Sequence, residues 1–219
     1  MAKPMQPEPK FFLIDELFEK GLTHYLETWF SGLPTYGVAG EKSTNYLENS
    51  IAAKRIHDAL AEVKLIFVFR EPADRAFSNW RWSRMNGLET LTFGEAIQAE
   101  PAREANYPPE LKYSRPFSYY SRGLYRRMLD PYWRLFSRDR VLCLRYEDIT
   151  IDPRKLAATV HEYLDVRLQP SDAEAVGTVN PSDKTMSDSE NLDILRQMYR
   201  QPNRDLAELL GPSFEIWNP

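Results

Sequence analysis

The sequence predicts an α/β fold with a parallel β-sheet, because two kinds of segment alternate along the chain. Residues 64–70 (KLIFVFR) and 140–149 (RVLCLRYEDI) contain short continuous apolar runs, which are typical of strands buried on both faces. Residues 21–30 (GLTHYLETWF) and 50–63 (SIAAKRIHDALAEV) carry apolar side chains at helical spacing. Helices that alternate with buried strands indicate a layered α/β domain.

The elements follow one another from a proline-rich start to a C-terminal helix. Three prolines in residues 1–10 predict a loop. The helix over 21–30 is followed by the helix over 50–63, with Ser50 as its N-cap and Ile56, Ala59 and Leu60 facing inward. The remaining expected elements are the strand 64–70, a helix opened by Pro72, the strand 140–149, a helix over 152–166, a polar loop over 171–191 and a final helix over 192–211.

The size and composition of the chain predict one domain over residues 1–219. A length of 219 residues with 42% hydrophobic residues is enough for one sizeable core. The formal net charge of −4 gives no overall basic field, so we expect neither nucleic acid nor an anionic membrane as a partner. No apolar run approaches the roughly 20 residues of a membrane span, and residues 1–12 lack the apolar part of a signal peptide.

Cysteine and histidine usage adds two further expectations. The single cysteine, Cys143, cannot form an internal disulfide and lies in an apolar run, where an inert buried thiol is typical. We therefore expect a cytoplasmic protein. The three histidines, His24, His57 and His161, lie on separate predicted helices, so we expect no metal site.

An anion site is predicted where the strand over 64–70 meets the next helix. Arg70 comes at the carboxyl end of that strand, where open α/β sheets bind ligands, and Pro72 begins the helix. The backbone N–H groups and the dipole at a helix start favour an anion by roughly 0.3 to 1 kcal/mol. Ser78 lies nearly two turns further on and can face the same side. Phosphate suits such a site.

A plainer interpretation of the same residues stays open from spacing alone. Arg70 and Arg75 can instead pair with Glu71 and Asp74 on a solvated turn.

The spacing of these residues resembles a motif of a known enzyme family. The pattern R-x-P-x-x-R-x-x-S, here Arg70, Pro72, Arg75 and Ser78, is similar to the 3′-phosphate-binding motif of sulfotransferases. These enzymes use 3′-phosphoadenosine 5′-phosphosulfate (PAPS) as the sulfuryl donor. The resemblance implies that Arg70 and Ser78 hold the 3′-phosphate, and that the fold is a three-layer parallel sheet flanked by helices, like that of P-loop NTPases.

Further segments resemble the heparan-sulfate and N-deacetylase-sulfotransferase-like branch of that family, in the same order. PEPKFF at 7–12 is similar to a segment whose glutamate is the catalytic base, which implies that role for Glu8. GEKSTNYL at 40–47 implies that Lys42 lies near donor and acceptor, and SRGLYRRML at 121–129 implies nucleotide contacts for Gly123 and Tyr125. The plainer alternatives are that Glu8 is simply exposed in a loop and that Lys42 forms a surface pair with Glu41.

The resemblance implies a reaction and its reactants. A base takes the proton of a hydroxyl or amine on a saccharide or small metabolite, and cations stabilise the charge that develops during transfer. The enzyme also aligns the acceptor with the sulfuryl group. By analogy with phosphoryl transfer, no covalent enzyme intermediate and no metal are required. The expected co-substrate is PAPS.

One feature of the family has no counterpart in the sequence. Family members carry, upstream of the PEPKFF segment, a strand followed by a Gly-rich, lysine-containing loop that grips the 5′-phosphosulfate. The nine glycines here never cluster and no such loop occurs. We expect either that Met1 is an internal methionine of a longer protein or that this is a shortened homologue. A missing central strand would leave unpaired edges, so a partner copy or an upstream segment is expected to cover them.

Two other functions remain open on the sequence. One is a non-catalytic relative that keeps the 3′-phosphate site as a binding or interaction module. The other is a different α/β nucleotide enzyme, such as a kinase, although no phosphate loop or clear Mg²⁺-ligand motif supports it.

Overall fold

The computed structural model describes residues 8–32, 38–60, 62–108, 111–167 and 187–217. The predicted loop over 171–191 lies mostly outside the described residues, as does most of the N-terminal loop. The elements in the described part are α1 (Asp15–Phe18), α2 (Gly21–Phe30), α3 (Ser50–Ala59), β1 (Leu65–Phe69), α4 (Pro72–Met85), α5 (Phe93–Glu104), η2 (Ser121–Gly123), α6 (Tyr125–Leu135), η3 (Arg138–Arg140), β2 (Val141–Arg145), α7 (Asp148–Ile151), α8 (Pro153–Leu164), α9 (Ser189–Leu210) and η5 (Pro212–Trp217).

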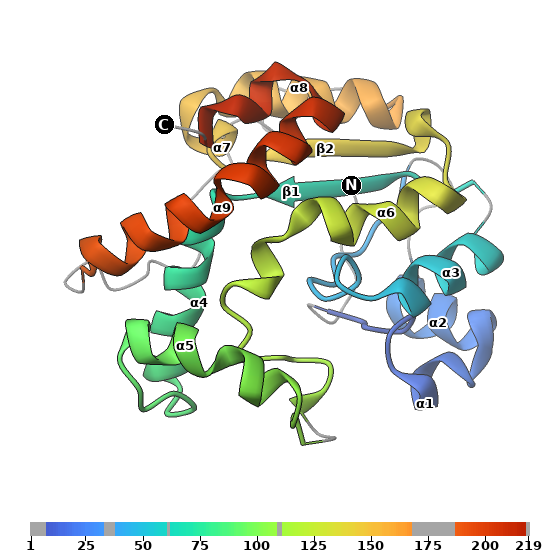
Figure 1. Cartoon of the computed structure of the whole chain (residues 1–219). Coiled ribbons are helices and arrows are strands. Elements are labelled where there is room, and N and C mark those ends of the chain that lie inside the picture. Colours follow the sequence, from blue (N-terminus) through green and yellow to red (C-terminus); the bar gives the residue numbers. More distant parts are fainter. Residues whose placement is uncertain (1–7, 33–37, 61, 109–110, 168–186, 218–219) are drawn as a thin grey trace. The chain divides into compact units, whose positions relative to one another are not determined.

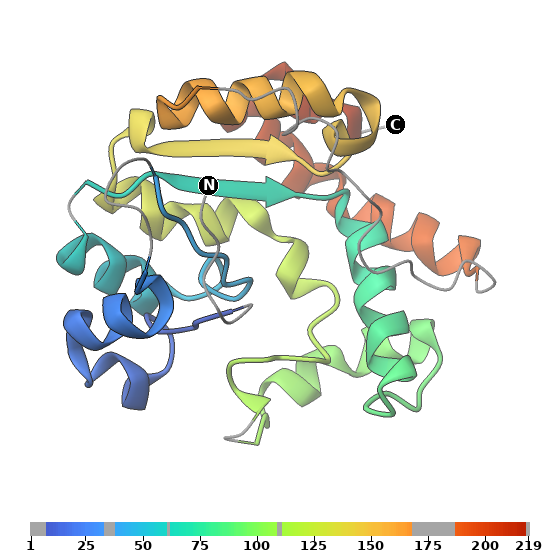
Figure 2. The same ribbon diagram turned by 180° about the vertical axis from the view of Figure 1, so that it is seen from behind.

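The two strands β1 and β2 are hydrogen-bonded neighbours and run in the same direction (Figures 1 and 2). Just beyond them, the backbone N–H of Tyr146 donates to the carbonyl of Phe69 over 2.6 Å. The chain between the strands passes through α4, α5 and α6, which is the long crossover that parallel pairing requires. The predicted α/β class with a parallel sheet is confirmed, and each strand lies within its predicted range.

The chain divides into two compact units, each made of three separate stretches of the sequence. The first unit comprises Met1–Phe67, Met128–Leu142 and Ile151–Ala175, and the second comprises Val68–Arg127, Cys143–Thr150 and Val176–Pro219. The division passes through both strands, so each unit holds part of the sheet. The prediction of one domain over 1–219 is not decided by this division and stays a prediction.

The first unit has an aromatic core at its N-terminal end. Phe11 and Tyr25 stack with ring centroids 4.6 Å apart, and Phe12 and Trp29 are buried beside them. The hydroxyl of the buried Tyr132 donates to the carbonyl of Tyr46 over 2.6 Å, which ties α6 to the segment before α3. These contacts fix the two short segments that carry the predicted base and lysine.

Helix α3 differs from the prediction at both ends. Its N-cap is Asn49, whose side chain accepts a hydrogen bond from the N–H of Ile51 over 2.9 Å, while Ser50 is the exposed first residue. An asparagine one residue upstream takes the capping role because its side-chain oxygen reaches the N–H two residues later. The helix ends at Ala59, before the predicted residue 63. Ile56 is buried as predicted, whereas Ala59 and Leu60 are only half-buried.

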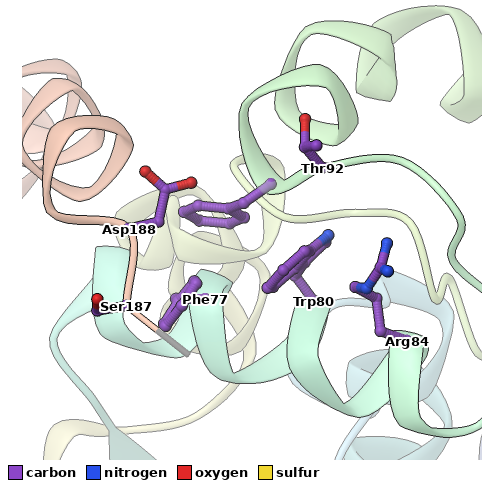
Figure 3. A pocket seen from close by; sticks show the side chains of 7 residues that line it. Phe77, Trp80, Arg84, Thr92, Ser187 and Asp188 are labelled. Carbon is purple, nitrogen blue, oxygen red and sulfur yellow. The ribbon is translucent and has the colours of Figure 1, made fainter. Parts of the chain in front are cut away.

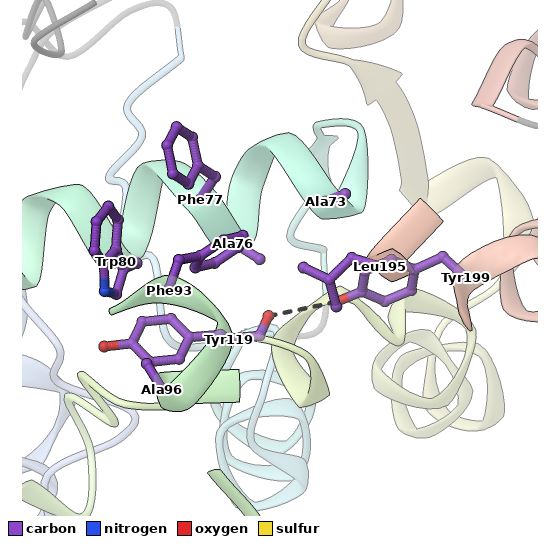
Figure 4. Packing of buried hydrophobic residues seen from close by; sticks show 9 residues of the cluster. All are labelled: Ala73, Ala76, Phe77, Trp80, Phe93, Ala96, Tyr119, Leu195 and Tyr199. Atoms are coloured by element: carbon purple, nitrogen blue, oxygen red, sulfur yellow. Dashed lines mark hydrogen bonds between the residues drawn. The ribbon is translucent and has the colours of Figure 1, made fainter. Parts of the chain in front are cut away.

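The core of the second unit packs α4 against α5 and α9 (Figure 4). Its buried members are Ala73, Ala76, Phe77, Trp80, Phe93, Ala96, Tyr119, Leu195 and Tyr199. Four of these residues, Ala73, Ala76, Phe77 and Trp80, lie at helical spacing on α4, which is why that helix buries one face. The opposite side of α4 is thereby left for the residues of the predicted anion site.

Helices α5 and α6 were not predicted, and neither was the short α7, whose first two residues fall in the predicted strand 140–149. Helix α5 occupies Phe93–Glu104. Its start carries a capping box between Thr92 and Glu95, a signal that the sequence contains. Both α5 and α6 contain an internal proline, Pro101 and Pro131, a residue that disfavours a helix interior. The last helix, α9, begins at Ser189, three residues before its predicted start.

No helix in the described residues combines the length and the apolar character needed to cross a membrane.

Candidate functional site

Arg70 directly follows β1, at the carboxyl end of the strand, as predicted. Its backbone carbonyl accepts a hydrogen bond from the Tyr125 hydroxyl over 2.8 Å, and its guanidinium lies 5.2 Å from the centre of the Tyr146 ring. Within the described part of the chain, no carboxylate forms an ion pair with this half-buried guanidinium. A cation withdrawn from water without a counter-ion favours the binding of an anion.

The start of α4 does not offer its backbone donors as predicted. The Glu71 carboxylate is the N-cap and accepts from the N–H groups of Ala73 at 3.1 Å and of Asp74 at 2.7 Å. Burial raises the pKa of Glu71 above its usual 4.5, against the backbone hydrogen bonds from Asp74 and Ala73 that lower it. Because these helix-start donors are already taken, an anion at this site depends on side chains.

The interpretation of this turn as two local ion pairs is wrong. Asp74 pairs with Arg196 of α9, with 3.0 Å between Oδ1 and Nη2. Glu71 caps the helix, and the Nη2 atom of Arg75 donates to the carbonyl of Tyr119. Neither acidic residue therefore neutralises Arg70.

Ser78 is half-buried on α4, in the same unit as Arg70. Arg75 lies one turn before it on the same side of the helix. The next residue, Asn79, accepts a hydrogen bond from the Nη1 atom of Arg122 over 3.2 Å. The side of α4 that carries Ser78 is therefore flanked by two arginines, and sequence reasoning gave no site role to Arg122.

Gly123 and Tyr125 have structural roles that the sequence did not reveal. A Cβ atom on the buried Gly123 would lie 2.4 Å from the Tyr199 hydroxyl, so Tyr199 occupies the space of a side chain. Burial raises the pKa of Tyr125 to about 12, so its hydroxyl stays protonated and donates to Arg70. Both residues support the predicted site, and their contacts with a nucleotide stay predictions.

In the first unit, Glu8 and Lys42 lie together. The Nζ atom of Lys42 is 2.9 Å from Oε1 of Glu8, the Thr44 hydroxyl donates to the same oxygen over 2.6 Å, and Lys10 lies 3.7 Å from the other oxygen. Burial raises the pKa of Glu8, but the hydrogen bonds from Thr44 and Lys42 and the two lysine charges prevail and hold it below 4.5. Glu8 is therefore an ionised carboxylate at neutral pH, in the form that accepts a proton.

Lys42 does not form the surface pair with Glu41 that was the plainer alternative. The Glu41 carboxylate instead accepts from the Ser43 hydroxyl over 3.0 Å, and the Ser43 oxygen accepts from the backbone N–H of Lys10 over 2.9 Å. Burial raises the pKa of Glu41, opposed by hydrogen bonds from Tyr46 and Ser43. The chain of contacts from Glu41 to Lys10 fixes the segment that carries Glu8. Thr44 and Lys10 are direct partners of Glu8 that the sequence did not reveal.

The predicted site residues thus fall into two groups. Glu8 and Lys42 lie together in the first unit, and Arg70, Ser78, Gly123 and Tyr125 belong to the second. Arg70 and Tyr125 are in direct contact. Among the described residues, no group of three or more His, Cys, Asp or Glu side chains can hold a metal ion.

A separate pocket in the second unit lies on another side of α4 (Figure 3). It has a volume of about 400 Å³ and is lined by Phe77, Trp80, Arg84, Thr92, Phe93, Ser187 and Asp188. Successive helical residues are about 100° apart around the axis, so Ser78 does not point into it with Phe77 and Trp80. The pocket contains none of the predicted site residues.

Comparisons with known proteins agree with the motifs. In sequence, the chain is 25% identical to a bifunctional heparan sulfate N-deacetylase/N-sulfotransferase 1 of Xenopus laevis, over 91% of this chain and 25% of that protein. It is 28% identical to a heparan sulfate glucosamine 3-O-sulfotransferase 6 of Mus musculus, over 76% of this chain and 45% of that protein. The chain therefore spans less than half the length of these two relatives.

A solved structure and a family profile extend the comparison. A sulfotransferase from Alicyclobacillus acidocaldarius has a similar fold, with a TM-score of 0.77 and 24% identity, over 99% of this chain and 87% of that one. The profile of the sulfotransferase domain matches residues 46–190, which include Arg70, Ser78, Gly123 and Tyr125. Since this match covers more than half of the sequence, the chain belongs to the sulfotransferase domain family.

Proposed function

We propose that this protein transfers a sulfuryl group from PAPS to a hydroxyl or amine of a saccharide. The observation that carries the proposal is Arg70, a half-buried guanidinium at the end of β1 with no carboxylate partner among the described residues, followed on α4 by Ser78. An arginine and a hydroxyl are the donors that a phosphate dianion requires. The heparan sulfate relatives support a saccharide acceptor, and their names give the acceptor class.

In the proposed reaction, Glu8 is the general base. Its carboxylate takes the proton of the acceptor O–H or N–H while the acceptor atom forms a bond to sulfur. The bond between sulfur and the bridging oxygen of the 5′-phosphate breaks, and 3′,5′-adenosine bisphosphate leaves with the electron pair. Lys42, held 2.9 Å from Glu8, supplies positive charge beside the reacting groups. No covalent bond to the protein forms.

Residues of this chain are assigned to only one end of the PAPS donor. Arg70 and Ser78 hold the 3′-phosphate in this proposal, while no residue of the 219 is assigned to the 5′-phosphosulfate, because no Gly-rich lysine loop occurs among them. This same observation favours the second candidate, a nucleotide-binding module without catalysis. The expectations of a cytoplasmic location, of catalysis without a metal and of a partner copy at the sheet edge stay predictions.

Calorimetry with two nucleotides tests the donor site. The protein is expected to bind 3′,5′-adenosine bisphosphate more tightly than adenosine 5′-phosphate, because only the former carries the group that Arg70 and Ser78 recognise. Arg70→Ala should remove most of this preference, since a hydrogen bond to a charged group contributes about 1.5 to 3 kcal/mol. Arg84→Ala is the matched control, because Arg84 lines the separate pocket and not the predicted phosphate site. Equal affinity of the wild-type protein for both nucleotides would contradict a 3′-phosphate site.

A further inference from the structure

The backbone of residues 119–121 is held on one side by a buried carboxylate. Glu100 of α5 is only 3% exposed and accepts hydrogen bonds from three successive N–H groups, those of Tyr119 at 2.9 Å, Tyr120 at 2.6 Å and Ser121 at 2.7 Å. No ion pair joins this carboxylate to a cation in the described part of the chain. The backbone donors therefore satisfy a charge that would otherwise be costly to bury.

The carbonyl groups of the same segment are held by two other elements. The Tyr199 hydroxyl of α9 donates to the carbonyl of Tyr120 over 2.7 Å and lies 3.4 Å from that of Tyr119, the contact dashed in Figure 4. Arg75 of α4 also donates to the Tyr119 carbonyl. The segment is thus fixed by one residue each from α4, α5 and α9, and we refer to Arg75, Glu100 and Tyr199 as the clamp.

The segment held by the clamp, residues 119–121, lies immediately before residues that support the candidate donor site. Two residues after Ser121 comes Gly123, packed on Tyr199, and then Tyr125, whose hydroxyl holds the carbonyl of Arg70. Arg122, between Ser121 and Gly123, donates to Asn79, the neighbour of Ser78. A shift of the clamped backbone would therefore move the supports of both Arg70 and Ser78.

We infer that Glu100 is a positioning residue for the 3′-phosphate site, acting through the backbone of residues 119–121. The inference rests on the proposed function and adds to it a residue outside the binding motif. A carboxylate suits this task because its two oxygens accept from all three N–H groups, which an amide cannot do. In a Glu100→Gln variant, an NH₂ group would face a backbone N–H.

The test compares two identical substitutions in α5. Glu100→Gln is expected to weaken binding of 3′,5′-adenosine bisphosphate about tenfold or more and to change binding of adenosine 5′-phosphate much less, so that the preference for the 3′-phosphate falls. Glu95→Gln is the control, because Glu95 is exposed in a capping box where glutamine also serves. A role in stability alone would lower the melting temperature and leave the ratio of the two dissociation constants unchanged.

A second variant keeps the inference testable if Glu100→Gln does not fold. Tyr199→Phe retains the ring and removes only the hydroxyl that donates to Tyr120, and it should reduce the same preference about threefold or more. An unchanged preference in every folded variant, beside a wild-type protein that does prefer the bisphosphate, would overturn the positioning role alone. A wild-type protein without that preference would instead overturn the proposed donor site, and the inference with it.

Discussion

Oε1 of Glu8 accepts hydrogen bonds from both Lys42, at 2.9 Å, and Thr44, at 2.6 Å. The segment over 40–47 thus provides a cation and a hydroxyl that both stabilise the ionised form of the proposed base. Although the Lys42 side chain is 77% exposed, that of Glu8 is only 25% exposed. The carboxylate is therefore partly shielded from water and still available to a substrate.

Glu8→Gln should abolish most of the sulfuryl transfer without changing the affinity for the nucleotide. Loss of a general base lowers turnover about 10²- to 10⁴-fold, while binding of 3′,5′-adenosine bisphosphate depends on Arg70 and Ser78. Steady-state transfer assays and calorimetry on the same preparation measure the two effects. Glu16→Gln, an exposed change on α1, is the control. Unchanged turnover in Glu8→Gln would show that another group takes the proton.

The pH dependence of transfer should reflect the low pKa of Glu8. Because its pKa is held below 4.5, the base form persists as the pH falls to that value, and activity should be lost only at lower pH. Thr44→Val removes the largest of the lowering contributions and should move the acid limb of the rate profile upward. Folding stability should change with pH in the same direction. The stabilising contribution of Glu8 is present above its unfolded pKa and is lost as the pH falls through its folded pKa. An acid limb at the same pH in both proteins would contradict this assignment.

Gly123→Ala should destabilise the protein by about 1 to 3 kcal/mol, because the new methyl group would overlap the ring and hydroxyl of Tyr199. Urea unfolding measures the change. Gly94→Ala is the comparison: its methyl group would meet only the amide end of the Asn191 side chain, so the cost should be smaller. Equal stability of Gly123→Ala and wild type would mean that Tyr199 does not fill this space.

Glu71→Ala should separate stability from nucleotide binding. Removal of the N-cap costs about 0.5 to 2 kcal/mol of folding stability, because the N–H groups of Ala73 and Asp74 lose their acceptor. Binding of 3′,5′-adenosine bisphosphate should be retained or become tighter, since a carboxylate next to Arg70 disappears and helix-start donors are released. Thermal melts and calorimetry measure the two quantities. A clear loss of affinity in a folded variant would place Glu71 among the residues that bind the ligand.

Local geometry made one part of the site predictable. An apolar run, an arginine at its end and a proline directly after it define a strand end and a helix start, and helical spacing then places Ser78 on α4. These features depend on neighbours in the sequence. The family resemblance added Glu8 and Lys42, and the structure brings these two together.

The remaining features depend on contacts between distant residues. The plainer interpretation paired Glu71 with an arginine, yet Glu71 caps α4, and no local rule decides between these two uses of a carboxylate. Tyr199 fills the space over Gly123, and Glu100 binds the backbone of residues 119–121, across about 20 residues of sequence or more. Helices α5 and α6 were not predicted, and each contains an internal proline, although α9 was predicted with Pro202 inside it.

Sulfuryl transfer is tested most directly by following radiolabelled sulfate from PAPS to a desulfated heparan oligosaccharide, with the wild-type protein and with Arg70→Ala. The proposed function predicts labelled saccharide that accumulates with time in the wild-type reaction and falls about tenfold or more in the variant at limiting PAPS. Labelled product at equal rates in both reactions would contradict the role of Arg70, and no label above a protein-free control would contradict sulfuryl transfer to this class of acceptor.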